Sequence, residues 1–202
     1  MTGPSRRRPS DDHRGAGAPT DEDGRFVLVA GRRWRATDPS IPDGFRREIV
    51  RELMSARRAV GAVTRAGGDP HAQRQRVQDA KVALGERGEP WWEAATDDGR
   101  RRRIEATIRA LLRARGPESS ICPSDVARVV GAGAWRPLLD AVRGVAADLV
   151  AAGTIVVTQR AEQVDVTAVR GPVRFRQGAT MRACGLDVAD DPAGTGVSRR
   201  PT

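Results

Sequence analysis

The segment ICPSDVARVVG, residues 121–131, holds a cysteine whose thiol could act as a nucleophile. Cys122 precedes Pro-Ser-Asp, a run typical of a helix start, and a thiol at a helix N-terminus can have a lowered pKa and higher reactivity. Nucleophilic catalysis also needs a base and a group that orients the base. His71 is the one histidine outside the segments that we expect to be disordered, and it belongs to a different expected module.

Helix capping explains every residue of that stretch. Cys122 falls at the N-cap and Pro123 at the first helical position, where a missing N–H costs nothing. Asp125 favours the positive end of the helix dipole and can return a hydrogen bond to the N-cap amide. We therefore expect a structural helix cap, with redox or electrophile sensing and catalysis as the alternatives.

Two adjacent tryptophans, Trp91 and Trp92, could stack on bases or sugars. Glu86, Glu89 and Glu93 surround them and oppose a nucleic acid nearby. Large aromatic side chains commonly complete small cores. Structural packing is the favoured interpretation, and ligand stacking is the alternative.

Arginine carries almost all of the positive charge in a chain of 202 residues with a formal net charge of +9, because Lys81 is the sole lysine. Residues 100–178 hold 14 arginines and 7 acidic residues, an excess of seven, whereas residues 24–99 hold 14 basic and 11 acidic residues, an excess of three. A guanidinium suits phosphate. The charge distribution therefore favours a polyanionic partner for the C-terminal half.

The N-terminal half predicts a small module of a β-hairpin and two helices. Phe26–Ala30 and the segment RRWRA alternate as strands about Gly31, and the second strand carries Trp34, which we expect to be buried. Apolar residues at helical spacing follow over 43–63, with Asp43 as N-cap, and over 70–84, with Asp69 as N-cap and Gly85 at the end. Residues 1–23 lack apolar periodicity and are expected to be disordered.

The C-terminal half predicts three helices followed by two strands. Ile104, Ile108, Leu111 and Leu112 mark a helix that stops at Gly116-Pro117, residues 121–131 form the second, and residues 134–153 form the third, with Leu138, Val142, Val145 and Leu149 facing inward. TIVVTQ and VRFRQ are strands around a hairpin-like loop. This order is that of a winged helix-turn-helix.

Three motifs, ICPSDVARVVG, WRPLLDAVRGVAADLVAAGTIVVTQ and RGPVRFR, together resemble a small bacterial winged-helix family of unknown function over residues 101–177. Residues 25–93, with GRRWRATDP and GERGEPWWE, look like a second uncharacterised bacterial module. The resemblance implies the winged-helix fold and no established activity. Ala161 stands where the wing turn of that family often carries glycine.

The expected fold is therefore α+β and mainly helical. Its expected parts are a tail over 1–23, a hairpin and two-helix module over 24–96, a winged-helix domain over 97–178, and a disordered tail over 179–202.

A non-catalytic, nucleic-acid-binding protein of low sequence specificity is the leading functional hypothesis. The third helix of a winged helix faces the major groove, and here its outward face would hold Arg136, Asp140, Arg143 and Ala147. Phosphate contacts position a protein without specifying sequence. The arginines expected to contact nucleic acid are Arg101, Arg102, Arg136, Arg143, Arg160, Arg170, Arg174 and Arg176. For the run at 100–103, a solvated charge cluster is an equal alternative.

A protein-docking module with an unknown partner is the competing function, and an enzyme is the third. We expect no cofactor, because no glycine-rich phosphate loop is present, and no structural zinc, because His13 and Cys184 lie in the expected tails. The N-terminus lacks the apolar core of a signal peptide, and no apolar run approaches the ~18 residues of a membrane span. A cytoplasmic location is the resulting expectation.

Overall fold

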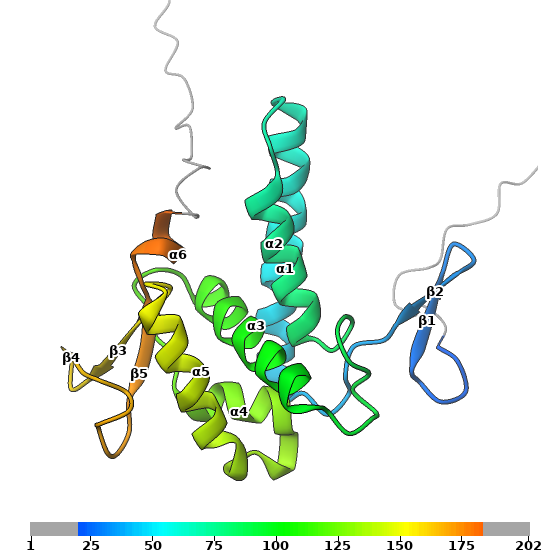
Figure 1. The fold of residues 1–202 in the computed structure, drawn as a ribbon. Helices are drawn as coiled ribbons and strands as arrows, with labels where there is room; N and C mark the ends of the chain where they lie inside the picture. The colour runs from blue at the N-terminus through cyan, green and yellow to red at the C-terminus, as the bar shows by residue number, and fades with distance from the viewer. Residues whose placement is uncertain (1–19, 184–202) are drawn as a thin grey trace, which may run out of the picture. The chain divides into compact units, whose positions relative to one another are not determined.

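The computed structural model describes residues 20–183 as an α+β arrangement of helices and small antiparallel sheets (Figure 1). By packing, the chain divides into two compact units between Thr37 and Asp38. This division falls at a different place from the boundary expected near residue 96. Most of both expected tails, with His13 and Cys184, lies outside the described residues.

The first unit contains the predicted β-hairpin. Strands β1 (Phe26–Val29) and β2 (Arg32–Arg35) pair antiparallel, with Val27 opposite Trp34. Ala30 and Gly31 both have positive φ, 48° and 75°, as a tight two-residue hairpin turn requires. The hairpin is confirmed, but the burial expected of Trp34 is wrong, because 42% of this residue is exposed.

Helices α1 (Asp43–Arg65) and α2 (His71–Ala83) pack side by side as a long helical hairpin (Figure 1). The expected apolar stripe is present, since Ile49 and Leu53 are buried. Asp43 lies in the first turn of α1 and the N-cap is Pro42, which corrects the expected cap by one position.

The C-terminal end of α2 follows the predicted signal, whereas its N-cap is Pro70, which corrects the expected cap at Asp69 by one position. Asp69 accepts the N–H of His71 at 3.0 Å, and Gly85 has a φ of 77° just after the helix. A Cβ at Gly85 would lie 3.1 Å from Trp91 Cδ1 and 3.2 Å from Asp38 Cβ. Glycine therefore permits both the left-handed backbone and the close approach of Trp91.

Helix α3 (Asp97–Arg115) is central, because it packs against α1, α2, α4 and α5. The four apolar residues predicted to face inward, Ile104, Ile108, Leu111 and Leu112, are fully buried. They belong to one hydrophobic cluster that includes residues of α1, α2 and the C-terminal elements. The helices expected in separate modules therefore share a core.

Ion pairs reinforce this packing at the C-terminal half of α3. Arg115 donates to Glu48 of α1 at 2.8 Å and to Asp125, in the first turn of the next helix, at 2.9 Å. Arg113 donates to Asp79 of α2 at 2.5 Å. Both arginine side chains are more than three-quarters buried.

The predicted second helix is α4 (Pro123–Gly131), and the third is shorter than expected. Two 3-10 turns, η1 (Ala132–Ala134) and η2 (Arg136–Leu138), precede α5 (Leu139–Ala151). Ala132 has a φ of 45°, which breaks the helical path, and Pro137 lies within the second turn. The buried face of α5 is as predicted, with Val142, Val145 and Leu149 in the core.

The second sheet has strand order β4 (Glu162–Gln163), β3 (Ile155–Gln159), β5 (Arg174–Gln177), all antiparallel. Val157 lies opposite Phe175, and a further bridge joins Ile121 to Phe175. A short helix, α6 (Ala179–Ala183), follows, with Met181 buried. These five residues are therefore structured, which corrects the tail expected from residue 179.

The β3–β4 turn carries a conformational cost. Arg160 and Ala161 have φ values of 52° and 72°, the left-handed region that favours glycine. A Cβ is unfavourable in this conformation, so Ala161 is strained.

We predict that Ala161→Gly raises the free energy of unfolding by about 1 kcal/mol, because glycine adopts positive φ without the penalty of a Cβ. Ala161→Val should lower it, since branching at Cβ worsens the clash. Urea denaturation of the three proteins measures both changes. A less stable glycine variant would contradict the assigned turn conformation.

Candidate nucleic-acid interface

Cys122 is the N-cap of α4, as predicted. Its amide donates to Asp125 Oδ2 at 3.2 Å and its thiol donates to Asp125 Oδ1 at 3.1 Å, while Sγ lies 2.8 Å from Ser124 Oγ. Helix capping accounts for the position of the cysteine, and its thiol is held by a carboxylate and a hydroxyl. Sensing and catalysis stay hypotheses.

Asp125 links this cap to the core of the fold. Burial would raise the pKa of Asp125, but hydrogen bonds from the Cys122 thiol and amide and from Arg115, together with the charge of Arg115, outweigh burial. The pKa of Asp125 is therefore below its ordinary value, and the charged carboxylate is the form that the folded state stabilises.

The arginine run at 100–103 lies in the first turns of α3, after a Thr96 cap that accepts the Gly99 amide at 3.0 Å. Arg101 donates to Asp148 of α5 at 2.5 Å, and the hydrogen bond and charge of Asp148 raise the pKa of Arg101. Arg102 is three-quarters exposed, with Asp98 at 3.7 Å. The run is thus helical, and of the two arginines predicted as contacts here, Arg102 is the less tightly paired.

Arg143 is turned away from the predicted outward face of α5. Its guanidinium donates to the carbonyls of Gly171 at 2.6 Å, Val169 at 3.3 Å and Val166 at 3.4 Å. Arg143 therefore fastens the loop between β4 and β5 to the helix.

The exposed face of α5 is acidic, not basic. Asp140, Gly144 and Asp148 are exposed on it, and Asp148 is paired with Arg101. Acidic side chains on this face repel phosphate, so α5 is poorly suited to enter a groove of DNA.

One set of exposed arginines lies on and around the sheet of β3, β4 and β5. Arg174 lies opposite Thr158 and Arg176 opposite Val156, so both project from one face of β5, while Phe175 between them is buried. Arg176 donates to the Glu118 carbonyl at 3.0 Å, whereas Arg174 is exposed to solvent.

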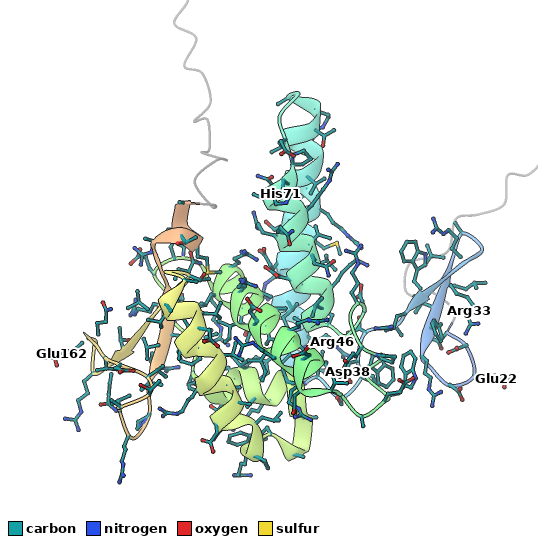
Figure 2. The ribbon with its side chains drawn as sticks, in the orientation of Figure 1. Glu22, Arg33, Asp38, Arg46, His71 and Glu162 are labelled. Carbon is teal, nitrogen blue, oxygen red and sulfur yellow. The ribbon has the colours of Figure 1, made fainter. Side chains whose placement is uncertain are left out.

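Arg160 and Arg170 lie at one end of the same sheet. Arg160 is in the β3–β4 turn, and the Gln159 side-chain amide donates to the carbonyls of Arg170 and Pro172 at 2.8 and 3.2 Å, which brings the turn and the loop together. Both arginines are exposed. Glu162, in the neighbouring strand, points away from the sheet (Figure 2).

One cluster of cationic side chains was not predicted from the sequence. Arg128 of α4 and Arg136 of η2 both place their guanidinium groups over the Trp135 ring, at 5.0 and 4.7 Å from its centroid. Arg136 was a predicted contact, but Arg128 was not, because a continuous helix over 134–153 gives no reason to bring Trp135 against α4. The 3-10 turns create this cluster.

The described residues thus define an α+β protein with a small antiparallel sheet whose exposed face and turn carry arginines. Residues 101–178 match the family model described as a protein of unknown function, DUF3253. No curated protein matches the chain. The resemblance to an uncharacterised family over 101–177 is thereby confirmed, while the second module over 25–93 stays a prediction.

None of the helices described within residues 20–183 combines the length and the apolar character needed to cross a membrane.

We predict that Asp125→Asn lowers the free energy of unfolding by about 1 kcal/mol at pH 7, because it removes a half-buried charge bound to Arg115. The folded pKa lies below the unfolded value of about 4, so the charge stabilises the fold above that pH. This contribution disappears as the pH falls through the folded pKa.

Urea denaturation at two pH values measures this effect. The free energy of unfolding of Asp125→Asn should lie further below that of the wild type at pH 7 than at pH 3. Asp98→Asn, at a carboxylate that is largely exposed, is the matched control. A difference that stays constant with pH would contradict the role assigned to the Asp125 charge.

We predict that Arg143→Gln releases the loop between β4 and β5, because three carbonyls lose a charged donor. Hydrogen exchange at the amides of residues 167–169 should accelerate, and the free energy of unfolding should fall by about 1 kcal/mol. Arg174→Gln, which removes the same charge from an exposed side chain, should leave this exchange unchanged. Equal exchange in the two variants would show that Arg143 does not hold the loop.

Proposed function

We propose that residues 101–178 form a winged helix-turn-helix module that binds nucleic acid with little sequence specificity and without catalysing a reaction. The element order supports this: α3, α4 and α5 are followed by β3 and β5, with a loop and β4 between them. The bridge from Ile121 to Phe175 adds the segment before α4 to the edge of the sheet. Under this proposal β3, β4 and the loop to β5 are the wing.

The observation that carries the proposal is the contrast between two sets of arginines. On α3, Arg101, Arg113 and Arg115 are matched by acidic side chains of neighbouring elements. On the wing and β5, Arg160, Arg170 and Arg174 are exposed and make no ion pair within residues 20–183. Unmatched guanidinium groups on and around one small sheet suit a row of phosphates.

The wing replaces α5 as the main contact in this proposal. The acidic exposed face of α5 disfavours entry into the major groove, and phosphate contacts from a wing carry no base readout. Arg102 and the Arg128–Trp135–Arg136 cluster supply further positive charge on other elements of the same unit. Low sequence specificity follows from this distribution.

Protein docking is the second candidate, and one observation favours it. Of the described residues, the large apolar side chains that are exposed are Leu28, Val29 and Trp34, all within the hairpin of the first unit. An exposed apolar cluster is typical of a surface that a partner covers.

The test is fluorescence anisotropy of a labelled random duplex titrated with the full chain across a salt series. The variant Arg160→Glu/Arg170→Glu/Arg174→Glu should weaken binding at least tenfold and reduce the salt slope by about three units, one for each phosphate that the variant no longer neutralises. The control Arg47→Glu/Arg57→Glu/Arg58→Glu changes the net charge equally on the exposed side of α1. It should leave the slope unchanged.

Two outcomes overturn the proposal in different ways. Equally weakened binding by both triple variants would mean that net charge, and not the wing, drives binding. Absence of binding at low salt by the folded protein would remove nucleic acid as the partner and leave the hairpin of residues 26–35 as the surface to study.

A further inference from the structure

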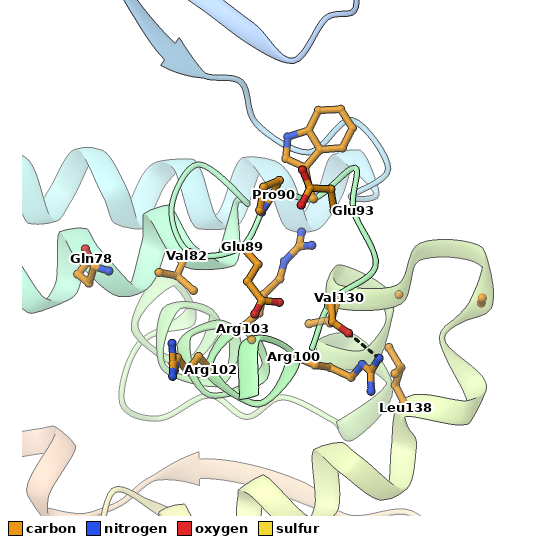
Figure 3. Close-up of a pocket in the computed structure, with 16 residues that line it drawn as sticks. Gln78, Val82, Glu89, Pro90, Glu93, Arg100, Arg102, Arg103, Val130 and Leu138 are labelled. Atoms are coloured by element: carbon orange, nitrogen blue, oxygen red, sulfur yellow. Dashed lines mark hydrogen bonds between the residues drawn. The ribbon is translucent and has the colours of Figure 1, made fainter. Parts of the chain in front are cut away.

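A cavity of about 700 Å³ lies apart from the wing, between the first turns of α3, the end of α4 and the segment 86–95 (Figure 3). Its lining residues all belong to the second unit. The volume is in the range of small-ligand sites, which span about 300–1,000 Å³. The proposed nucleic-acid interface shares Arg102 with this cavity.

Two apolar side chains of the lining, Trp91 and Leu138, have fixed positions. Trp91 packs against Gly85, whose Cβ would come within 3.1 Å of the indole, and meets Trp92 edge to face at 5.1 Å between ring centroids. Leu138 packs so closely on Gly131 that a Cβ there would lie 2.5 Å from Leu138 Cδ1. The cavity therefore has preformed apolar walls, as small-molecule sites usually have.

Arg103 also lines this cavity, and some of its N–H donors have no partner within residues 20–183. Its Nη2 donates to Asp38 Oδ2 at 2.6 Å, and its Nε is buried without a partner. Within residues 20–183, Nη1 makes no hydrogen bond. A guanidinium has five N–H donors, so a single carboxylate oxygen leaves Arg103 poorly satisfied.

Arg102 adds a second, less constrained guanidinium to the lining, since its pair with Asp98 is exposed and 3.7 Å long. Arg100 also lines the cavity, but it is bound to Asp97 at 2.9 Å and to the Ala95 carbonyl at 3.3 Å. The available donors are therefore those of Arg102 and Arg103.

The two glutamates of the lining offset part of this charge. Glu89 accepts the Thr96 hydroxyl at 2.5 Å and the Thr96 amide at 2.9 Å, and these hydrogen bonds lower the pKa of Glu89. Its carboxylate therefore stays ionised, but its oxygens are directed to Thr96 at the start of α3, where Gly99 leaves room for them. Glu93 is exposed, so its charge is screened by solvent.

We propose that this cavity binds a small organic monocarboxylate. The apolar body of the ligand lies between Trp91 and Leu138, and its carboxylate accepts from Arg102 and from Nη1 of Arg103. A monoanion fits better than a phosphate because Asp38 already offsets the charge of Arg103 and leaves Arg102 as the less tightly paired cation. A cationic amine fits worse, because three arginines line the site and the Glu89 oxygens are occupied by Thr96.

The experiment titrates the full chain with benzoate and follows the indole N–H signals of the protein by two-dimensional NMR at constant ionic strength. The chain has four tryptophans, so Trp34, in the other unit, is an internal control. We expect a saturable shift of the Trp91 signal with a Kd of about 1 mM, a modest affinity for so small a ligand. Benzamide, the uncharged analogue, should bind at least tenfold more weakly.

Two variants test whether Arg102 contacts the carboxylate of the ligand. Arg102→Gln should raise the Kd for benzoate about tenfold, and because Arg102 is exposed the variant should keep its fold. Arg58→Gln, an exposed change on α1, should leave the Kd unchanged. The proposal is overturned if benzoate gives no saturable shift of Trp91 at tens of millimolar, if benzamide binds equally, or if Arg102→Gln has no effect.

Discussion

The fold depends on one guanidinium that joins three helices. Arg115, at the end of α3, is bound to Glu48 of α1 and to Asp125 in the first turn of α4. Removing one member of such a largely buried set leaves the others without partners, which costs more than an exposed pair contributes. Together with the shared apolar cluster, this explains why α1 and α2 belong to one compact unit with the segment that matches the family model. The helical hairpin is part of the support of the domain and not an appendage to it.

The pairing of charges also decides what the net charge of +9 means. Arginines of α3 are largely matched by acidic residues of α2, α4 and α5, so they stabilise the fold and add little to the outer field. Other exposed arginines form no ion pair within residues 20–183. One set lies in the β3–β4 turn, in the loop to β5 and on β5, and another lies on α1, where Arg47 and Arg58 are examples. The surface around the sheet is therefore cationic. The exposed face of α5, the helix expected to enter the DNA groove, is acidic. The position of unpaired charge, not its total, supports the proposed function.

Local signals made much of this fold predictable. The inward face of α3, the cap at Cys122 and the hairpin about Gly31 each follow from residues within one turn or two strands. What could not be predicted depends on residues far apart in the chain. Arg143 finds its acceptors in a loop without periodicity, and Arg103 pairs with Asp38 across 65 positions. Neither partner is marked by spacing, and for this reason Arg143 was expected on a DNA-facing surface that it does not occupy.

The turn between α4 and α5 contributes residues to both proposed binding surfaces, as Arg102 does on α3. Leu138, at one end of η2, lines the cavity, while Arg136, at the other end, stacks on Trp135 beside Arg128. A 3-10 turn of three residues is too short to let one end move independently of the other. A substitution at Arg136 would therefore disturb the cavity wall as well as the surface charge. Arginines on the wing are separated from Leu138 by the whole of α5, and for that reason they report on nucleic-acid binding without this ambiguity.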